Sequence, residues 1–90
     1  MAKYEVRFKR SVAKDLRKIP NQDVKGILHR INMLAENPRG FGCTKLVGNS
    51  RYRVRLGSYR ILYEIADDVL IIYVVKVAYR SRVYRKASNR

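Results

Sequence analysis

Arginine occupies every second position from 51 to 55, and a further arginine stands at position 60. The first three alternate with the apolar residues Tyr52, Val54 and Leu56. This period of two predicts a strand with its arginines on one face. Because a guanidinium group can bind two phosphate oxygens through parallel hydrogen bonds, such a row is suited to hold a phosphodiester chain.

The Gly57–Ser58 pair predicts the register of a hairpin. A two-residue turn with Gly first suits type II′, and it pairs residues whose numbers sum to 115. The predicted pairs that contain arginine are Arg55–Arg60, Arg53–Leu62 and Arg51–Glu64. Two arginines that face each other across strands are destabilising unless an anion lies between them. The pattern favours nucleic-acid binding; a solvated face with an ordinary Arg51–Glu64 ion pair is the alternative.

Most familiar catalytic arrangements are absent from the sequence. His29 is the only histidine and Cys43 the only cysteine, which argues against a disulfide framework, a Cys-rich zinc site or a His-cluster metal centre. We expect no metal and no cofactor. RNA, however, carries its own nucleophile, the 2′-hydroxyl, so an enzyme need only align it and neutralise the phosphoryl charge. Arginine can neutralise charge but is a poor base, and a tyrosine would serve as base only with a depressed pKa.

The elements that position the arginines follow from hydrophobic periodicity. Strands are predicted at 3–8, 44–47, 51–56, 59–66 and 69–77, the last apolar on both faces and therefore central. Two helices are predicted between the first two strands, one capped by Ser11 and ended by Pro20, the next capped by Asn21 and ended at Asn37–Pro38.

These elements predict one α+β domain over residues 1–90. It has an N-terminal strand, a helix hairpin and an antiparallel sheet of three to four strands, with the helices packed on one face. On this sheet Arg80 can swing towards the face that carries Arg53, Arg55 and Arg60, and Tyr84 offers a ring for stacking. Tyr73 is expected on the same open face as Leu62.

The charge balance points to an anionic partner. The chain has 21 Lys and Arg against 7 Asp and Glu, a formal net charge of +14. Nucleic acid or an acidic protein fits this charge, which also implies fast, salt-dependent association. The N-terminus lacks an apolar signal core, and the longest apolar run, 69–75, is far shorter than the roughly 20 residues that span a bilayer. We expect a soluble, cytoplasmic protein with no membrane partner.

Three segments resemble the RelE/ParE superfamily of toxins from type II toxin–antitoxin systems. They are KLVG at 45–48, YRVRLGSYRILYEI at 52–65 and VAYRSRVYR at 77–85. The opening strand and helix hairpin also fit, and the closing segment is more similar to RelE than to ParE. The resemblance implies a RelE-like fold and a ribosome-dependent endoribonuclease. Such toxins cut mRNA in the ribosomal A site by 2′-hydroxyl attack and leave a 2′,3′-cyclic phosphate.

The same resemblance implies roles for individual residues. Arg60 would stabilise the transition-state phosphate, Arg80 would bind the phosphate or assist the leaving 5′-oxygen, and Tyr84 would stack on or orient the mRNA. The implied RNA- and phosphate-binding residues are Lys45, Arg53, Arg55, Tyr79, Arg82 and Arg85. RelE toxins often have Lys where this chain has Arg53 and Arg55. The group that accepts the 2′-hydroxyl proton is therefore left open.

The family also implies partners. A cognate acidic, RelB-like antitoxin would cover the basic body, and the complex, rather than the toxin alone, would bind operator DNA. The ribosome and mRNA would be the targets of the free toxin. Two other functions remain as alternatives: a ParE-like inhibitor of DNA gyrase, and a non-catalytic nucleic-acid-binding module.

Overall fold

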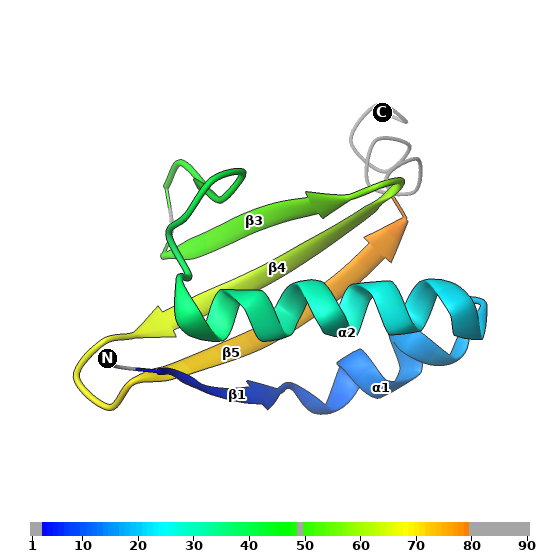
Figure 1. The fold of residues 1–90 in the computed structure, drawn as a ribbon, viewed down its shortest axis with the longest axis horizontal. Coiled ribbons are helices and arrows are strands. Elements are labelled where there is room, and N and C mark those ends of the chain that lie inside the picture. Colours follow the sequence, from blue (N-terminus) through cyan, green and yellow to red (C-terminus); the bar gives the residue numbers. More distant parts are fainter. Residues whose placement is uncertain (1–2, 49, 80–90) are drawn as a thin grey trace.

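The computed structural model of the chain describes residues 3–48 and 50–79. Its elements are β1 (Glu5–Phe8), α1 (Arg10–Arg17), α2 (Asn21–Glu36), β2 (Thr44–Lys45), β3 (Arg51–Leu56), β4 (Tyr59–Ala66) and β5 (Ile71–Tyr79). The strands form one sheet in the order β1-β5-β4-β3-β2. Both helices pack on the same face of this sheet (Figure 1), so the predicted α+β class is confirmed.

The antiparallel sheet expected after the helix hairpin is confirmed for β2 to β5, and the N-terminal strand, whose pairing the sequence left open, joins this sheet. β1 pairs in parallel with β5, with Glu5 opposite Ile71 and Phe8 opposite Val74. The sheet is therefore mixed and has five strands. β5 lies between β1 and β4, and this position explains why both of its faces are rich in apolar residues.

The helices are separated where the sequence places Pro20. The backbone at Pro20 is extended, with ψ of 142°, and α2 begins at the next residue. Ser11 and Asn21 were expected as caps, but both lie inside the first helical turn, after Lys9 and Pro20. Neither cap position forms a side-chain hydrogen bond. α2 ends at Glu36, before Asn37–Pro38, because the residue before a proline disfavours helical geometry.

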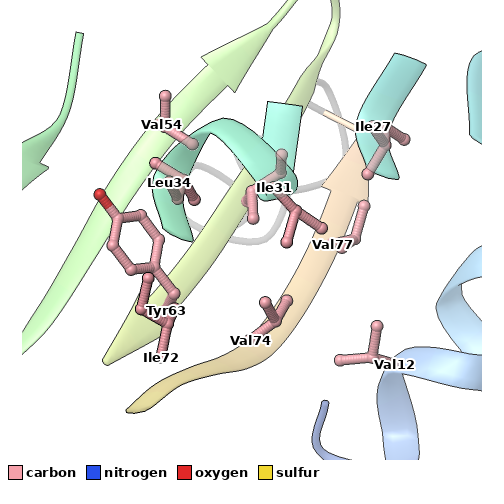
Figure 2. Packing of buried hydrophobic residues seen from close by; sticks show 10 residues of the cluster. Val12, Ile27, Ile31, Leu34, Val54, Tyr63, Ile72, Val74 and Val77 are labelled. Carbon is pink, nitrogen blue, oxygen red and sulfur yellow. The ribbon is translucent and has the colours of Figure 1, made fainter. Parts of the chain in front are cut away.

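The core lies between the helices and the sheet (Figure 2). Ile27, Ile31 and Leu34 repeat at helical spacing along α2 and are at most 1% exposed. Val12 of α1 and Tyr63 of β4 are completely buried in the same cluster. Among the helices of residues 3–48 and 50–79, none is long and apolar enough to cross a membrane.

The β3–β4 hairpin has the predicted register at every pair. Arg51 pairs with Glu64 and Arg55 with Arg60. The residue numbers of the other pairs also sum to 115. Gly57 has a φ of 57°, as the first position of a type II′ turn requires. β4 and β5 pair antiparallel, with an irregularity between Leu62 and Tyr63 that shifts the register by one residue.

The last strand begins two residues later than expected. Leu70 has a φ of 54°, the left-handed region, and completes the turn after Asp67. β5 therefore starts at Ile71 and continues to Tyr79, instead of running from 69 to 77.

A polar network ties the ends of four segments together beside this turn. Arg39 donates two hydrogen bonds to Asp67, at 3.1 and 2.8 Å, and a third to the Tyr52 hydroxyl at 3.0 Å. The Tyr4 hydroxyl donates to the same carboxylate at 2.6 Å. Hydrogen bonds from Arg39 and then Tyr4 lower the pKa of Asp67 from its ordinary value of 3.8 to about 2.

This lowered pKa predicts a loss of stability in acid. A carboxyl whose pKa is depressed by folding stabilises the native state above its ordinary pKa, and this contribution fades as the pH falls from about 4 to about 2. We expect Asp67→Asn to lower the melting temperature at pH 7 and to have a smaller effect at pH 2.5. Thermal unfolding followed by circular dichroism measures both differences. An equal drop at both pH values would contradict the assignment.

The Tyr63 hydroxyl supplies a second stability test. It donates a 2.6 Å hydrogen bond to the buried carbonyl oxygen of Pro38, fixing the loop after α2 on the sheet. Tyr63→Phe removes the donor and leaves that carbonyl buried, at an expected cost of about 1–3 kcal/mol in urea unfolding. Tyr52→Phe, in the half-buried ring stacked on Tyr63, is the control and should cost less. Equal losses would show that the Pro38 bond has no special weight.

Candidate nucleic-acid interface

The arginines of β3 lie on the sheet face that the helices leave uncovered. Val54 and its partner Ile61 are buried in the core. Because side chains alternate along a strand, Arg53 and Arg55 point to the opposite face. The pairing also places Arg60 of β4 on this face, directly opposite Arg55. We call Arg53, Arg55 and Arg60 the arginine face.

The neighbouring arginine of β3 has an ordinary structural role. Arg51 donates to Glu64 at 3.1 Å, across the pair that the hairpin register predicts. Both side chains are roughly 40% exposed, so this ion pair is weak. In contrast, no hydrogen bond or ion pair within residues 3–48 and 50–79 involves the side chains of Arg53 or Arg55. Their charges are available to a ligand.

Arg60 sits deeper than the other two. It lies on β4 between Arg55 of β3 and Ala78 of β5, and it is 6% exposed. Strands on both sides fix its backbone, and the small Ala78 flanks it on the open face. A cation held this firmly can present its charge without rearranging, which is what transition-state stabilisation requires.

Two other predicted RNA-binding residues lie away from the arginine face. Lys45 pairs with Tyr52, and Tyr79 pairs with Tyr59, so both occupy the register of the helix-covered face. The Tyr79 ring packs edge-on against the Tyr59 ring, 5.5 Å away. The residue of β2 that pairs with Arg53 is Thr44, not Lys45. Thr44 was missed because the sequence predicted this strand without a pairing register.

The remaining predicted site residues, Arg80, Arg82, Tyr84 and Arg85, lie outside the described residues. Tyr73 is 39% exposed and pairs with Glu64 on the open face, as expected. Within the described part of the chain, no three His, Cys, Asp or Glu side chains gather in a way that would hold a metal ion.

A hollow of about 520 Å³ borders the arginine face beside β3. Arg53 and Arg55 line it together with Arg30 of α2 and the aromatic residue Phe41. The sequence alone does not distinguish Arg30 or Phe41 as site residues. Arg30 lies among the many basic residues of the helices, and only the tertiary fold brings it near β3.

Comparison with known proteins agrees with this architecture. The family model described as ParE toxin of the type II toxin–antitoxin system parDE matches residues 6–84. The chain is a RelE/ParE-superfamily toxin. A RelE1 sequence of Methanocaldococcus jannaschii is 32% identical to this toxin over 87 residues, covering 92% of this chain and 97% of the relative. Toxin RelG of Mycobacterium tuberculosis is 29% identical, covering 92% and 98%.

Solved structures of RelE toxins share the fold of this toxin. The toxin–antitoxin complex RelBE2 of Mycobacterium tuberculosis matches with a TM-score of 0.82 at 26% identity, covering 90% of this chain and 95% of the other. The isolated Escherichia coli RelE toxin matches with a TM-score of 0.75 at 26% identity, covering 97% of both chains. The toxin is therefore RelE-like in its curated relatives and its fold, although the matching family model is that of ParE.

Repulsion between Arg55 and Arg60 makes a measurable prediction. Arg55→Gln removes one of two facing charges, so we expect the melting temperature to rise at about 0.01 M salt. The gain should vanish at about 1 M salt, where the Debye length falls to about 3 Å. Arg17→Gln, the same change at an exposed position of α1, is the control for the general effect of net charge. Identical shifts in the two variants would contradict a specific repulsion at the arginine face.

Proposed function

We propose that this RelE-like toxin is a ribosome-dependent endoribonuclease that cuts mRNA in the ribosomal A site. The observation that carries the proposal is the pairing of Arg55 with Arg60 on the uncovered face of the sheet. This pair concentrates positive charge beside Arg53, with Arg55 exposed to a phosphodiester and Arg60 largely buried behind it. The RelE relatives and RelE structures support the same class of function.

In the proposed reaction, the RNA supplies the nucleophile. The 2′-hydroxyl oxygen bonds to the adjacent phosphorus while the bond from phosphorus to the 5′-oxygen breaks, giving a 2′,3′-cyclic phosphate and a 5′-hydroxyl end. The 2′-hydroxyl gives up its proton to a base, and the leaving 5′-oxygen takes up a proton. Negative charge grows on the phosphoryl oxygens, where Arg60 and Arg55 stabilise it. Arg53 holds the neighbouring backbone in line for attack.

The C-terminal segment completes the proposed site. We assign Arg80 to the phosphate or the leaving 5′-oxygen and Tyr84 to stacking on the mRNA and orienting its 2′-hydroxyl, with Arg82 and Arg85 binding flanking phosphates. The arginine guanidinium keeps its proton near neutral pH, so it cannot accept another proton as a base. Proton transfer therefore falls to another group. Tyr84 is the candidate among the assigned residues, because Arg82 and Arg85 are close to it in the sequence and positive charge favours a phenolate.

The proposal includes an acidic, RelB-like antitoxin as partner. Solved structures of RelE toxins include the RelE–RelB complex of Pyrococcus horikoshii and the intact RelBE complex of Escherichia coli. A domain with a net charge of +14 would attract such a chain over long range at low salt. We further propose that the toxin acts in the cytoplasm and reaches operator DNA only within the antitoxin complex.

Inhibition of DNA gyrase is the second candidate, since the matching family model is that of ParE toxins. That function needs a protein-binding surface and no phosphate chemistry. It would leave mRNA intact and would be insensitive to a charge-conserving change at Arg60.

Cleavage on programmed ribosomes tests the proposal. We expect the wild-type toxin to cut a defined mRNA only at the A-site codon and only with ribosomes. Arg60→Lys keeps the charge but loses the fork that binds two oxygens, so the single-turnover rate should fall about 100-fold. Arg17→Gln is the control and should cut at the wild-type rate; circular dichroism verifies the fold of both variants.

Two results would contradict this assignment. Full cleavage by a folded Arg60→Lys toxin would remove Arg60 from the reaction. Intact mRNA with the wild-type toxin, combined with loss of gyrase supercoiling activity, would favour the second candidate.

A further inference from the structure

The hollow beside β3 has a composition that the proposed chemistry does not explain. It lies where the short β2 leaves β3 uncovered, since β2 pairs only with Tyr52 and Arg53. Its lining comes from α2, from the loop before β2 and from both strands. The lining residues are Arg30, Phe41, Gly42, Thr44, Arg53, Val54 and Arg55.

The charge of this hollow is uncompensated. Among the residues that the structure describes, three arginines line it and no Asp or Glu does. Most carboxylates of the described chain are engaged elsewhere, with hydrogen bonds or ion pairs at Glu5, Asp15, Asp23, Glu64 and Asp67. An anion in the hollow would therefore meet positive charge on several sides.

The loop that closes the hollow is held by one of its arginines. Arg30 Nη2 donates to the Phe41 carbonyl oxygen at 3.1 Å. Gly42 has a φ of 86°, a left-handed geometry that disfavours other residues. This backbone turn places the Phe41 carbonyl beside the Arg30 guanidinium, and both residues line the hollow. Arg30 thus uses one N–H donor for the loop, and its other guanidinium donors remain for a ligand.

Phe41 itself contributes nothing to the core. Its side chain is 100% exposed, although burial of a phenylalanine normally stabilises a fold. In proteins that bind single-stranded nucleic acids, exposed aromatic rings along a positively charged groove are the usual platform on which bases stack. Phe41 is thus free to stack on a ligand that offers both a flat ring and an anion.

We propose that the hollow is a nucleotide subsite of the arginine face. Arg30 and Arg53 bind the phosphate of a nucleotide that flanks the cleavage point, and Phe41 stacks on its base. Arg55 lines the hollow and also faces Arg60, so one RNA strand passes from the scissile phosphate into the subsite. The inference rests on the proposed endoribonuclease function, because that function places RNA on this face.

An acidic peptide added to the edge of β3 is the rival occupant. Peptides that extend a sheet are held mainly by main-chain hydrogen bonds along the strand. β3 runs to Leu56, so only residues 54–56 lie beyond the pairs with β2. This stretch is shorter than the five to six residues of a typical strand. A peptide would also leave the stacking surface of Phe41 without a specific role.

Binding of a short RNA that cannot be cut tests the subsite. The probe is a labelled single-stranded hexanucleotide with 2′-O-methyl groups, which lacks the nucleophile, and affinity is read by fluorescence anisotropy. We expect Phe41→Ala to weaken binding about tenfold with an unchanged salt dependence. Arg30→Gln should weaken binding severalfold and lower the slope of log affinity against log salt by about 0.7, the value for one single-strand phosphate contact.

Matched controls lie close by. Val47→Ala changes another apolar side chain that is 99% exposed but does not line the hollow, and Arg17→Gln removes one charge from the outer surface of α1. Both should bind the probe with nearly wild-type affinity. Circular dichroism verifies that Phe41→Ala and Arg30→Gln remain folded.

The outcomes separate this inference from the proposed function. Wild-type affinity of Phe41→Ala and Arg30→Gln for the RNA would overturn the subsite, even if the toxin cuts mRNA. Weaker binding of both variants to an acidic dodecapeptide, with RNA binding unchanged, would assign the hollow to the rival. Loss of RNA binding in both variants supports the subsite, even if the wild-type toxin fails to cut mRNA on ribosomes.

Discussion

The register of the β3–β4 hairpin is the constraint on which the site depends. It places Arg55 opposite Arg60 and, on the other face, Val54 opposite Ile61. Because side chains alternate, a slip of one residue would turn arginines into the core and valine and isoleucine into solvent. Burial of the apolar face therefore also holds the arginines in place. Gly57, with its φ of 57°, allows the tight turn that sets this register.

The helices cover only one face of the sheet, so one face forms the core and the other carries the arginine face. α1 and α2 cover one face and supply the apolar side chains that close the core (Figures 1 and 2). The opposite face carries Arg53, Arg55 and Arg60 beside some apolar side chains, among them Leu62. Asp15 of α1 accepts hydrogen bonds from Lys76 at 3.1 Å and from the Val77 backbone at 3.2 Å, which tie β5 to α1. The strand that carries Arg60, β4, pairs with β5 on one side and with β3 on the other.

Alternating residue types and turn residues predicted the parts of this toxin whose structure depends on neighbouring residues in the sequence. The bounds of β3 and β4 and every pair between them follow from alternation and one turn. The parallel pairing of β1 could not be read from the sequence, because alternation identifies a strand but says nothing of its neighbour's direction. The prediction that Ser11 and Asn21 cap the helices was wrong. The N-cap positions belong to Lys9 and Pro20, which precede the first helical residues.

The site was predicted in part. Arg53, Arg55 and Arg60 come together because a hairpin is a local structure. Lys45 and Tyr79 have the register of the helix-covered face, which depends on how β2 and β5 align with their neighbours. Arg30 and Phe41 escaped prediction because a contact between a helix, a loop and a strand edge arises only from tertiary packing. Their meeting at the hollow extends the arginine face beyond its own strands.

The central claim is that RNA phosphate binds between Arg55 and Arg60. Nuclear magnetic resonance of the arginine Nε–Hε groups, during titration with an uncleavable single-stranded RNA, tests this most directly. The account predicts that the largest shifts occur at Arg53, Arg55 and Arg60, while Arg10 and Arg17 of α1 barely move. Shifts concentrated on the helix arginines, with the arginine face unchanged, would contradict it.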